Sequence, residues 1–210
     1  FAGIADRLRD SRRLTGFALE PQDWRDALHD LVQGMHAGTS SVLSDVPGKE
    51  EEVINVLPAA IRHLLEQAQR DVTIANAYIV PGQESIDWLK GQTARGVRYR
   101  ILTNSLASHD VPAVNAHYKQ WRRDLIEAGV ELYETRPDAA VQPLVVDTPP
   151  VEAEFMGLHA KAMVIDGARV FIGSMNLDPR SWRLNSEMGV VVESAGLAAD
   201  LRGRRHRARL

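Results

Sequence analysis

The sequence predicts an α/β protein, namely a layered α/β/α sandwich with a mixed, largely parallel sheet. Three observations lead to this fold class. Between residues 40 and 133, short β-prone runs alternate with segments of helical periodicity, which is typical of parallel strands joined by helices. Residues 159–174 then contain two apolar, strand-like runs around Asp166-Gly167, which predicts an antiparallel hairpin in the same sheet. The 210 residues are 44% hydrophobic and 25% charged, as expected for one globular domain with or without an extension.

The elements follow in order along the chain. Residues 1–39 are polar with a helical pattern, so we divide the chain into a helical extension or connector over 1–39 and an α/β domain over 40–210. We expect strands at 41–44, 72–75, 97–102, 130–133 and 190–192, and helices at 50–69, 85–94 and 112–128. Pro58 should kink or interrupt the first of these helices. Residues 136–152 hold four prolines and should form a long loop over the sheet edge or the site.

Polar residues at fixed spacing mark the hairpin, as H-x-K-x4-D-x6-G-S-x-N over residues 159–176. If Asp166-Gly167 is a two-residue turn, His159 lies opposite Ser174, and strand alternation places His159 and Lys161 on one side. An imidazole, an ammonium and a hydroxyl should therefore meet at the open end of the hairpin. Asp166 would be a turn residue rather than a chemical one. Because both faces of the hairpin are apolar, it should form the centre of the sheet.

These groups suit phosphoryl transfer. A neutral histidine such as His159 can attack phosphorus, and Lys161 can hold the charge of the non-bridging oxygens. Ser174 and Asn176 can donate further hydrogen bonds to those oxygens. Glu187 precedes the last expected strand, and a carboxylate returning to the site would fix the histidine tautomer. An isolated His-x-Lys pair is usually a strand-edge feature, so the whole string carries the interpretation.

The string resembles the HKD motif of the phospholipase D superfamily. Residues 157–189 around it are most similar to bacterial cardiolipin synthases and their close phospholipase D-like relatives. Residues 78–82, 101–107 and 129–134 also resemble that branch.

The resemblance implies roles for the motif residues. His159 would be nucleophile or general acid, forming a phosphohistidine intermediate, and Glu187 would be its partner. The phosphate ligands would be Lys161, Ser174 and Asn176. No metal or other cofactor is expected, because no acidic or histidine cluster suggests a metal site.

Family members build each site from two HKD motifs, and this chain has one. The second half would come from a homodimer or from the same longer chain, of which this chain resembles the C-terminal HKD half. His117-Tyr118-Lys119 with Asp124 repeats part of the pattern. It lies in an expected helix, where positions i and i+2 point about 200° apart, so we reject it as a second motif.

We also assign expected roles to one asparagine after a strand end and to two glycines of the motif. Asn104 follows a strand end, where α/β proteins place ligand contacts. It either binds the substrate phosphate or, as is more common, stabilises a turn. We assign Gly167 and Gly173, with Asp166, to the turns of the motif.

Charge bears on the substrate. The formal net charge is −3, yet residues 201–210 carry five arginines and the rest holds 20 basic against 28 acidic residues, or −8. A nuclease is usually more basic, so nucleic acid is an unlikely partner and a phospholipid is the expected substrate. The arginines would touch a membrane surface or form a basic helix end. The chain has no cysteine, so the redox compartment cannot be read from the sequence. No apolar run reaches about 18 residues, and we expect a cytoplasmic protein peripheral to the inner membrane.

The expected function is phosphodiester transfer or hydrolysis on phospholipids, of the cardiolipin synthase type. The alternatives are a phospholipase D-family nuclease acting as a homodimer, and an inactive half-module that lacks its partner motif.

Overall fold

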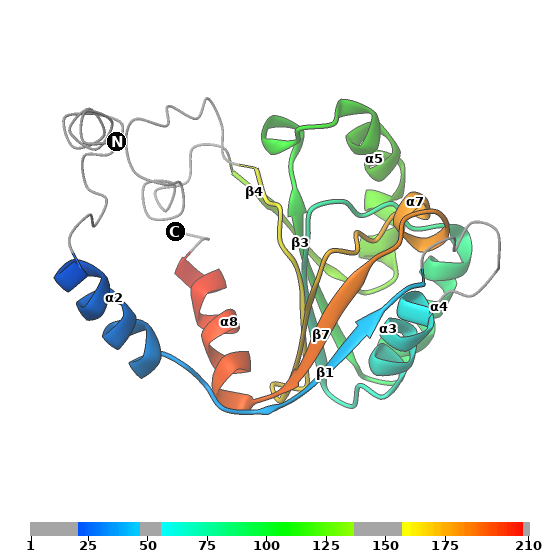
Figure 1. Cartoon of the computed structure of the whole chain (residues 1–210). Helices are drawn as coiled ribbons and strands as arrows, with labels where there is room; N and C mark the ends of the chain where they lie inside the picture. Colours follow the sequence, from blue (N-terminus) through cyan, green and yellow to red (C-terminus); the bar gives the residue numbers. More distant parts are fainter. Residues whose placement is uncertain (1–20, 47–55, 137–156, 208–210) are drawn as a thin grey trace, which may run out of the picture.

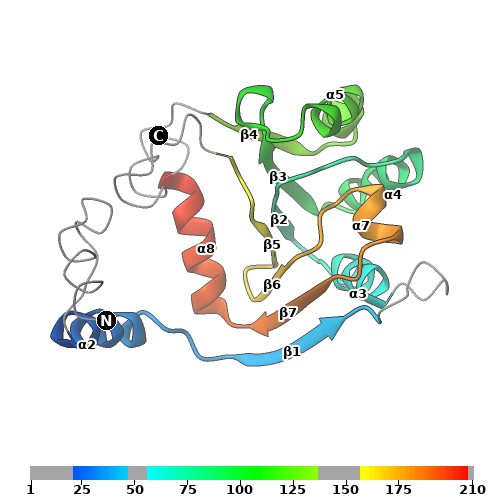
Figure 2. The ribbon, with the colours of Figure 1, turned by 45° about the horizontal axis from the view of Figure 1, so that its top comes forward.

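A computed structural model describes residues 21–46, 56–136 and 157–207. These residues form one mixed sheet of seven strands in the order β1-β7-β6-β5-β2-β3-β4, with helices on both faces (Figures 1 and 2). The strands are β1 (Thr39–Ser44), β2 (Asp71–Asn76), β3 (Arg98–Asn104), β4 (Glu131–Thr135), β5 (Lys161–Ile165), β6 (Arg169–Gly173) and β7 (Met188–Glu193). The helices are α2 (Pro21–Gln33), α3 (Val56–Glu66), α4 (Gln83–Ala94), the 3₁₀ helix η2 (Leu106–Ser108), α5 (Pro112–Glu127), α7 (Pro179–Arg183) and α8 (Ala195–Arg207). The predicted layered α/β fold with a mixed sheet is confirmed.

The sheet contains fewer parallel pairs than the sequence predicted. Only β2–β3 and β3–β4 pair in parallel, whereas the other four neighbouring pairs are antiparallel. Five of the seven strands nevertheless run in one direction, and β5 and β7 run in the other. Each reversed strand has neighbours of the major direction, since β5 lies between β2 and β6, and β7 lies between β6 and β1. The expectation of a largely parallel sheet is therefore wrong for the pairings.

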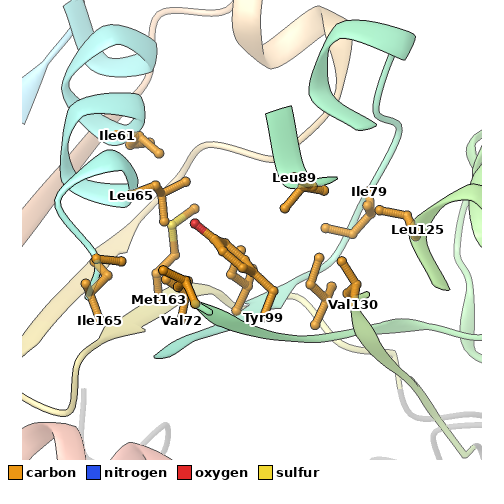
Figure 3. Packing of buried hydrophobic residues seen from close by; sticks show 14 of the residues in the cluster. Ile61, Leu65, Val72, Ile79, Leu89, Tyr99, Leu125, Val130, Met163 and Ile165 are labelled. Atoms are coloured by element: carbon orange, nitrogen blue, oxygen red, sulfur yellow. The ribbon is translucent and has the colours of Figure 1, made fainter. Parts of the chain in front are cut away.

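The larger core lies between the sheet and helices α3, α4 and α5 (Figure 3). The sheet side chains alternate, so one face of β2, β3 and β5 points into this core. Tyr99 at its centre is fully buried and meets the Trp88 ring edge-on at 6.0 Å between centroids. Burial raises the pKa of the Tyr99 phenol, which therefore stays neutral. Apolar burial of this extent holds the strand ends, and hence the site, in fixed positions.

Helix α8 packs on the opposite face, over the central hairpin (Figure 2). Val164 of β5 and Val170 of β6 meet Ala198 of α8 in a second buried cluster. Arg202 of the same helix forms an ion pair with Asp71 at the start of β2. One arginine of the basic C-terminal segment thus fixes α8 to the sheet, and residues 208–210 lie outside the described part of the chain.

Several sequence expectations concern the ends of elements. Pro58 lies in the first turn of α3, where a missing N–H costs nothing, so it does not kink the helix. The beginning of the helix expected at 50–69 and nearly all of the loop expected at 136–152 lie outside the described residues. The division of the chain at residue 40 stays a prediction. Helix α2 precedes β1 (Figure 1). Four apolar residues of α2 and Met35 just after it are more than half exposed, the four being Trp24, Leu28, Leu31 and Val32.

Candidate active site

The hairpin of the motif has a three-residue loop, and this shifts its register by one. Asp166 and Gly167 both have positive φ, of 52° and 67°, as expected for a type I′ turn. Ala168 adds a third loop residue, so that Ile165 pairs with Arg169. The Ala168 carbonyl accepts from Ser194 N–H at 2.8 Å, which continues the register of β6 with β7. The prediction that His159 lies opposite Ser174 is therefore wrong, because this register places Met175 there.

Asp166 joins the closed end of the hairpin to the connection between α3 and β2. Its carboxylate accepts three backbone N–H groups, from Gln69 at 2.9 Å, Arg70 at 2.8 Å and Asp71 at 3.1 Å. Burial alone would raise the pKa of Asp166, but these bonds and the Arg70 charge lower it below its ordinary 3.8. These contacts agree with a structural rather than a chemical role.

Gly173 is required by a close approach across β6 and β7. It pairs with Gly189, and the Phe171 ring lies against both glycines. A Cβ at Gly173 would come within 2.6 Å of the Met188 carbonyl oxygen and 2.7 Å of that ring. Only glycine lets the chain leave β6 at this point, immediately before Ser174.

His159 and Lys161 converge at the open end, as predicted from strand alternation. The Lys161 Nζ lies 3.1 Å from the His159 Nε2 and 2.8 Å from the His159 carbonyl oxygen. His159 is exposed, whereas Lys161 is only 8% exposed. Burial lowers the pKa of Lys161, and the nearby charges of Glu187, Asp110 and Asp178 oppose that shift. The site thus holds an accessible imidazole beside a cation set into the protein.

Ser174 meets the buried Glu187 at the same edge of the sheet. The Ser174 hydroxyl donates to the Glu187 carboxylate, whose other oxygen accepts from Asn185 Nδ2 at 3.1 Å. Asp45 fixes the backbone there, because its N–H donates to the Glu187 carbonyl at 2.8 Å and its carboxylate accepts from Glu187 N–H at 3.3 Å. The same carboxylate accepts from Leu57 N–H in the first turn of α3 at 2.9 Å. Within the described residues no hydrogen bond joins Glu187 to His159, so its role as the histidine's partner stays a prediction.

Asn176 lies where the chain crosses back over the end of β2. Its Oδ1 is buried and has no hydrogen-bond partner within the described residues. The crossing is held by Asn76, which is fully buried, donates to the Met175 carbonyl at 3.2 Å and accepts from Leu177 N–H at 3.3 Å. Asn176 is therefore held at the site edge by its neighbours, with an acceptor that the described protein groups leave unused.

Asn104 is committed to protein contacts, which contradicts its predicted role as a phosphate ligand. It is 1% exposed, and its two amide hydrogens go to the carbonyls of Ala77 at 3.2 Å and Leu158 at 2.9 Å. Its Oδ1 accepts from Leu158 N–H at 2.7 Å. Since Leu158 directly precedes His159, these bonds hold the segment that leads to His159.

Sequence reasoning did not identify two site residues, Tyr78 and Asp110. Ala77 N–H donates to the Ala160 carbonyl at 3.1 Å, which continues the β2–β5 ladder and places Tyr78 opposite His159. The Tyr78 hydroxyl donates to the Asp110 carboxylate, with both oxygens at 2.9 Å. Tyr78 had a signal, since it follows β2 at the edge where the motif lies. Asp110 had a weaker signal, since His109-Asp110 follows the end of β3, where α/β proteins place ligand contacts, but no pattern assigned it a role.

The family comparisons agree with this geometry. Residues 61–207 match the family described as cardiolipin synthase, phospholipase D-like domain. The chain belongs to this family. Over 160 residues, which are 75% of the chain, the domain is 41% identical to cardiolipin synthase C of Escherichia coli strain K12 and covers 34% of that protein. The chain thus spans about a third of the length of the curated relatives it matches.

Two solved structures have the fold of this phospholipase D-like domain. Nuc from Salmonella typhimurium, a phospholipase D family member, superposes with a TM-score of 0.56 at 17% identity, over 80% of this chain and 91% of Nuc. Phosphatidylserine synthase from Haemophilus influenzae Rd KW20 superposes with a TM-score of 0.59 at 17% identity, over 83% of this chain and 39% of the synthase. In the ranges that the structure describes, no group of three or more His, Cys, Asp or Glu side chains could hold a metal ion. No described helix is both long and apolar enough to span a membrane.

Proposed function

We propose that this domain supplies one half of the active site of a phospholipid phosphodiester transferase of the cardiolipin synthase type. The observation that carries the proposal is the 3.1 Å approach of His159 Nε2 and Lys161 Nζ at an exposed edge of the sheet. A nucleophilic nitrogen and a fixed positive charge at one point match the needs of a phosphodiester under attack. Membership of this domain in the family and its 41% identity to cardiolipin synthase C support a phospholipid as substrate.

The first step forms a bond between His159 and phosphorus. The Nε2 lone pair attacks, the phosphorus–oxygen bond to the leaving alcohol breaks, and the alkoxide takes a proton from the histidine of the second half. Lys161 releases Nε2 and turns its ammonium to a non-bridging oxygen, where it offsets the developing charge. In the second step an alcohol or water attacks phosphorus, loses its proton to that second histidine and frees His159. For the cardiolipin synthase type the second alcohol belongs to another phospholipid.

The other motif residues support the same phosphorus centre. Ser174 and Asn176 lie at the same sheet edge. The Asn176 amide can donate to the non-bridging oxygens, and the Ser174 hydroxyl can do so once it releases the Glu187 carboxylate to which it donates in the structure. Glu187 would stabilise the positive charge of an imidazolium ring, as a carboxylate does in a Ser-His-Asp triad. Its buried position favours this, because a buried charge interacts more strongly than an exposed one.

The second histidine comes from a second HKD half, supplied either by the same longer polypeptide, as its N-terminal half, or by a second copy in a homodimer. The domain would work at the inner membrane from the cytoplasmic side as a peripheral protein. The acidic balance of the chain before its last ten residues, at −8, favours a lipid over a polyanionic nucleic acid.

Trapping of the covalent intermediate tests the proposal. The full-length protein is mixed with phosphatidylglycerol labelled at phosphorus, denatured during turnover, and digested to locate the label. We expect label on His159 in the wild type and none there in His159→Ala. His117→Ala is the matched control, because His117-Tyr118-Lys119 has the same His-x-Lys spacing on helix α5, and it should keep both label and turnover. A wild type that turns over without label, or that carries it only on another histidine, contradicts the assignment of His159.

A further inference from the structure

One carboxylate at the site is not explained by phosphate chemistry. Asp110 accepts from the hydroxyl of Tyr78, which lies opposite His159 in the β2–β5 register, and its charge raises the pKa of Lys161 against the effect of burial. A carboxylate repels the non-bridging oxygens of a phosphodiester, so Asp110 does not help to bind that group. Its side chain is 54% exposed. It is therefore accessible to the substituents of a phosphodiester bound at the site.

Asp110 is held in a fixed arrangement. The Tyr78 hydroxyl donates to it, and the Tyr78 ring stacks on the His109 ring at 5.2 Å between centroids with 12° between planes. The His109 side chain is only 2% exposed, and its Nδ1 accepts from Val111 N–H at 3.1 Å. Burial and the bond to Asp110 raise the pKa of Tyr78 to about 12, so the phenol remains a donor. The Asp110 carboxylate is thus held by the Tyr78 hydroxyl, and the stacked His109 ring holds Tyr78 in place.

The arrangement leaves acceptor capacity on Asp110. A carboxylate has about four acceptor sites on its two oxygens, and the single Tyr78 proton is shared between oxygens that are both 2.9 Å away. A group that accepts only, placed beside a cation that binds phosphate, fits a ligand with a hydroxyl close to its phosphorus. A glycerol headgroup has this chemistry, whereas an ethyl ester does not.

We propose that Asp110, positioned by Tyr78, binds the free hydroxyl of a glycerol headgroup next to the reacting phosphorus and thereby selects polyol lipids. This inference rests on the proposed function and names the part of the substrate that the HKD residues do not contact. The glycerol can belong to the lipid that is cleaved or to the alcohol that accepts the phosphatidyl group, since both pass the same opening.

The test compares lipids that differ in the headgroup hydroxyls. With the full-length protein in mixed detergent micelles, kcat/KM is measured for phosphatidylglycerol and for phosphatidylethanol as donors. In a second arm phosphatidylethanol is the donor, and glycerol competes with 1-propanol as acceptor. The variants are Asp110→Asn and Tyr78→Phe, which keeps the stacked ring. The matched control is Asp87→Asn, an exposed carboxylate on α4 that accepts from Gln83 at 2.9 Å.

We expect the wild type to prefer the glycerol compound by about tenfold in one arm, as a charge-assisted hydrogen bond provides. Asp110→Asn should reduce this preference, measured as the ratio of kcat/KM between the two compounds, to about threefold or less. Any effect of the lost charge on Lys161 is common to both compounds and cancels in that ratio. Tyr78→Phe should act in the same direction, and Asp87→Asn should change nothing. The arm in which the preference falls identifies the donor or the acceptor as the source of the glycerol.

Equal losses for both compounds in Asp110→Asn would indicate a merely structural role and overturn the inference. An unchanged preference in both arms would overturn it too. If the wild type turns over neither lipid, the proposed function fails and the inference with it. If the wild type is active without discrimination, only the inference fails.

Discussion

Substitution of Asp166 tests whether the aspartate of the motif acts through stability rather than chemistry. Its carboxylate accepts hydrogen bonds from three backbone N–H groups, and the backbone of Asp166 has a positive φ of 52°. Asp166→Ala leaves these donors without their acceptor, at a cost of about 3 kcal/mol, since they share one partly solvated carboxylate. Alanine at a left-handed position adds roughly 1 kcal/mol, for a total near 4 kcal/mol. Asp166→Gly should cost only about 3 kcal/mol, because glycine tolerates that backbone conformation.

Asp166→Asn keeps one acceptor oxygen and tolerates positive φ, so it should cost about 1.5 kcal/mol. Urea unfolding followed by circular dichroism at pH 7 measures all three variants. The folded-state pKa of Asp166 is lowered from 3.8, so its stabilisation is present above that value and is lost as pH falls through the folded-state pKa. The difference between wild type and Asp166→Asn should therefore shrink below about pH 4.

The reasoning fails if Asp166→Ala and Asp166→Asn unfold within about 0.5 kcal/mol of the wild type. It fails equally if Asp166→Asn, still folded at the assay temperature, loses several orders of magnitude in kcat. That result would place the carboxylate in the chemistry.

Three further substitutions probe separate parts of the site. Gly173→Ala should lower the free energy of unfolding by about 2 kcal/mol, because the added methyl overlaps a backbone carbonyl. As a control, Gly91→Ala on α4, where the added methyl meets open space, should raise the free energy of unfolding by about 0.5 kcal/mol. Asn104→Ala should destabilise by about 3 kcal/mol in urea unfolding and lower kcat, because it frees buried donors and acceptors and releases the approach to the catalytic strand; an equally stable variant contradicts this. Asp178→Asn can still cap α7 but removes a charge that raises the pKa of Lys161. The alkaline limb of kcat/KM against pH should thus move to lower pH, and a move to higher pH would refute the assignment.

The local features of the site followed from the sequence. Alternation along a strand brings His159 and Lys161 together whatever the rest of the fold does, and Asp166-Gly167 encodes positive φ through residue type. Both predictions depend on neighbours in sequence, and both are confirmed, although the loop has three residues where the sequence predicted two. The layered α/β fold was predictable for the same reason, since each helix and strand carries its own periodicity.

The features that the sequence did not predict depend on distant partners. Ala168 is a third loop residue whose carbonyl accepts from Ser194, a contact that no property of the hairpin sequence indicates. Asn104 carries the residue type of a phosphate ligand, yet its amide is used by a chain segment 54 residues away. Asp110 lies in the irregular connection after η2. Its position depends on its bond to Tyr78, whose ring stacks on His109.

The contacts of Asp45 make the first strand of the sheet relevant to a truncated polypeptide. Asp45 follows β1, an edge strand, and ties the backbone of Glu187 to the first turn of α3. A fragment cut after residue 45 would retain all residues of the HKD motif and most of the apolar core. It would nevertheless lose the two bonds from Asp45 that hold the backbone of the buried Glu187. We therefore expect such a shortened product to be less active than the longer chain even where it folds.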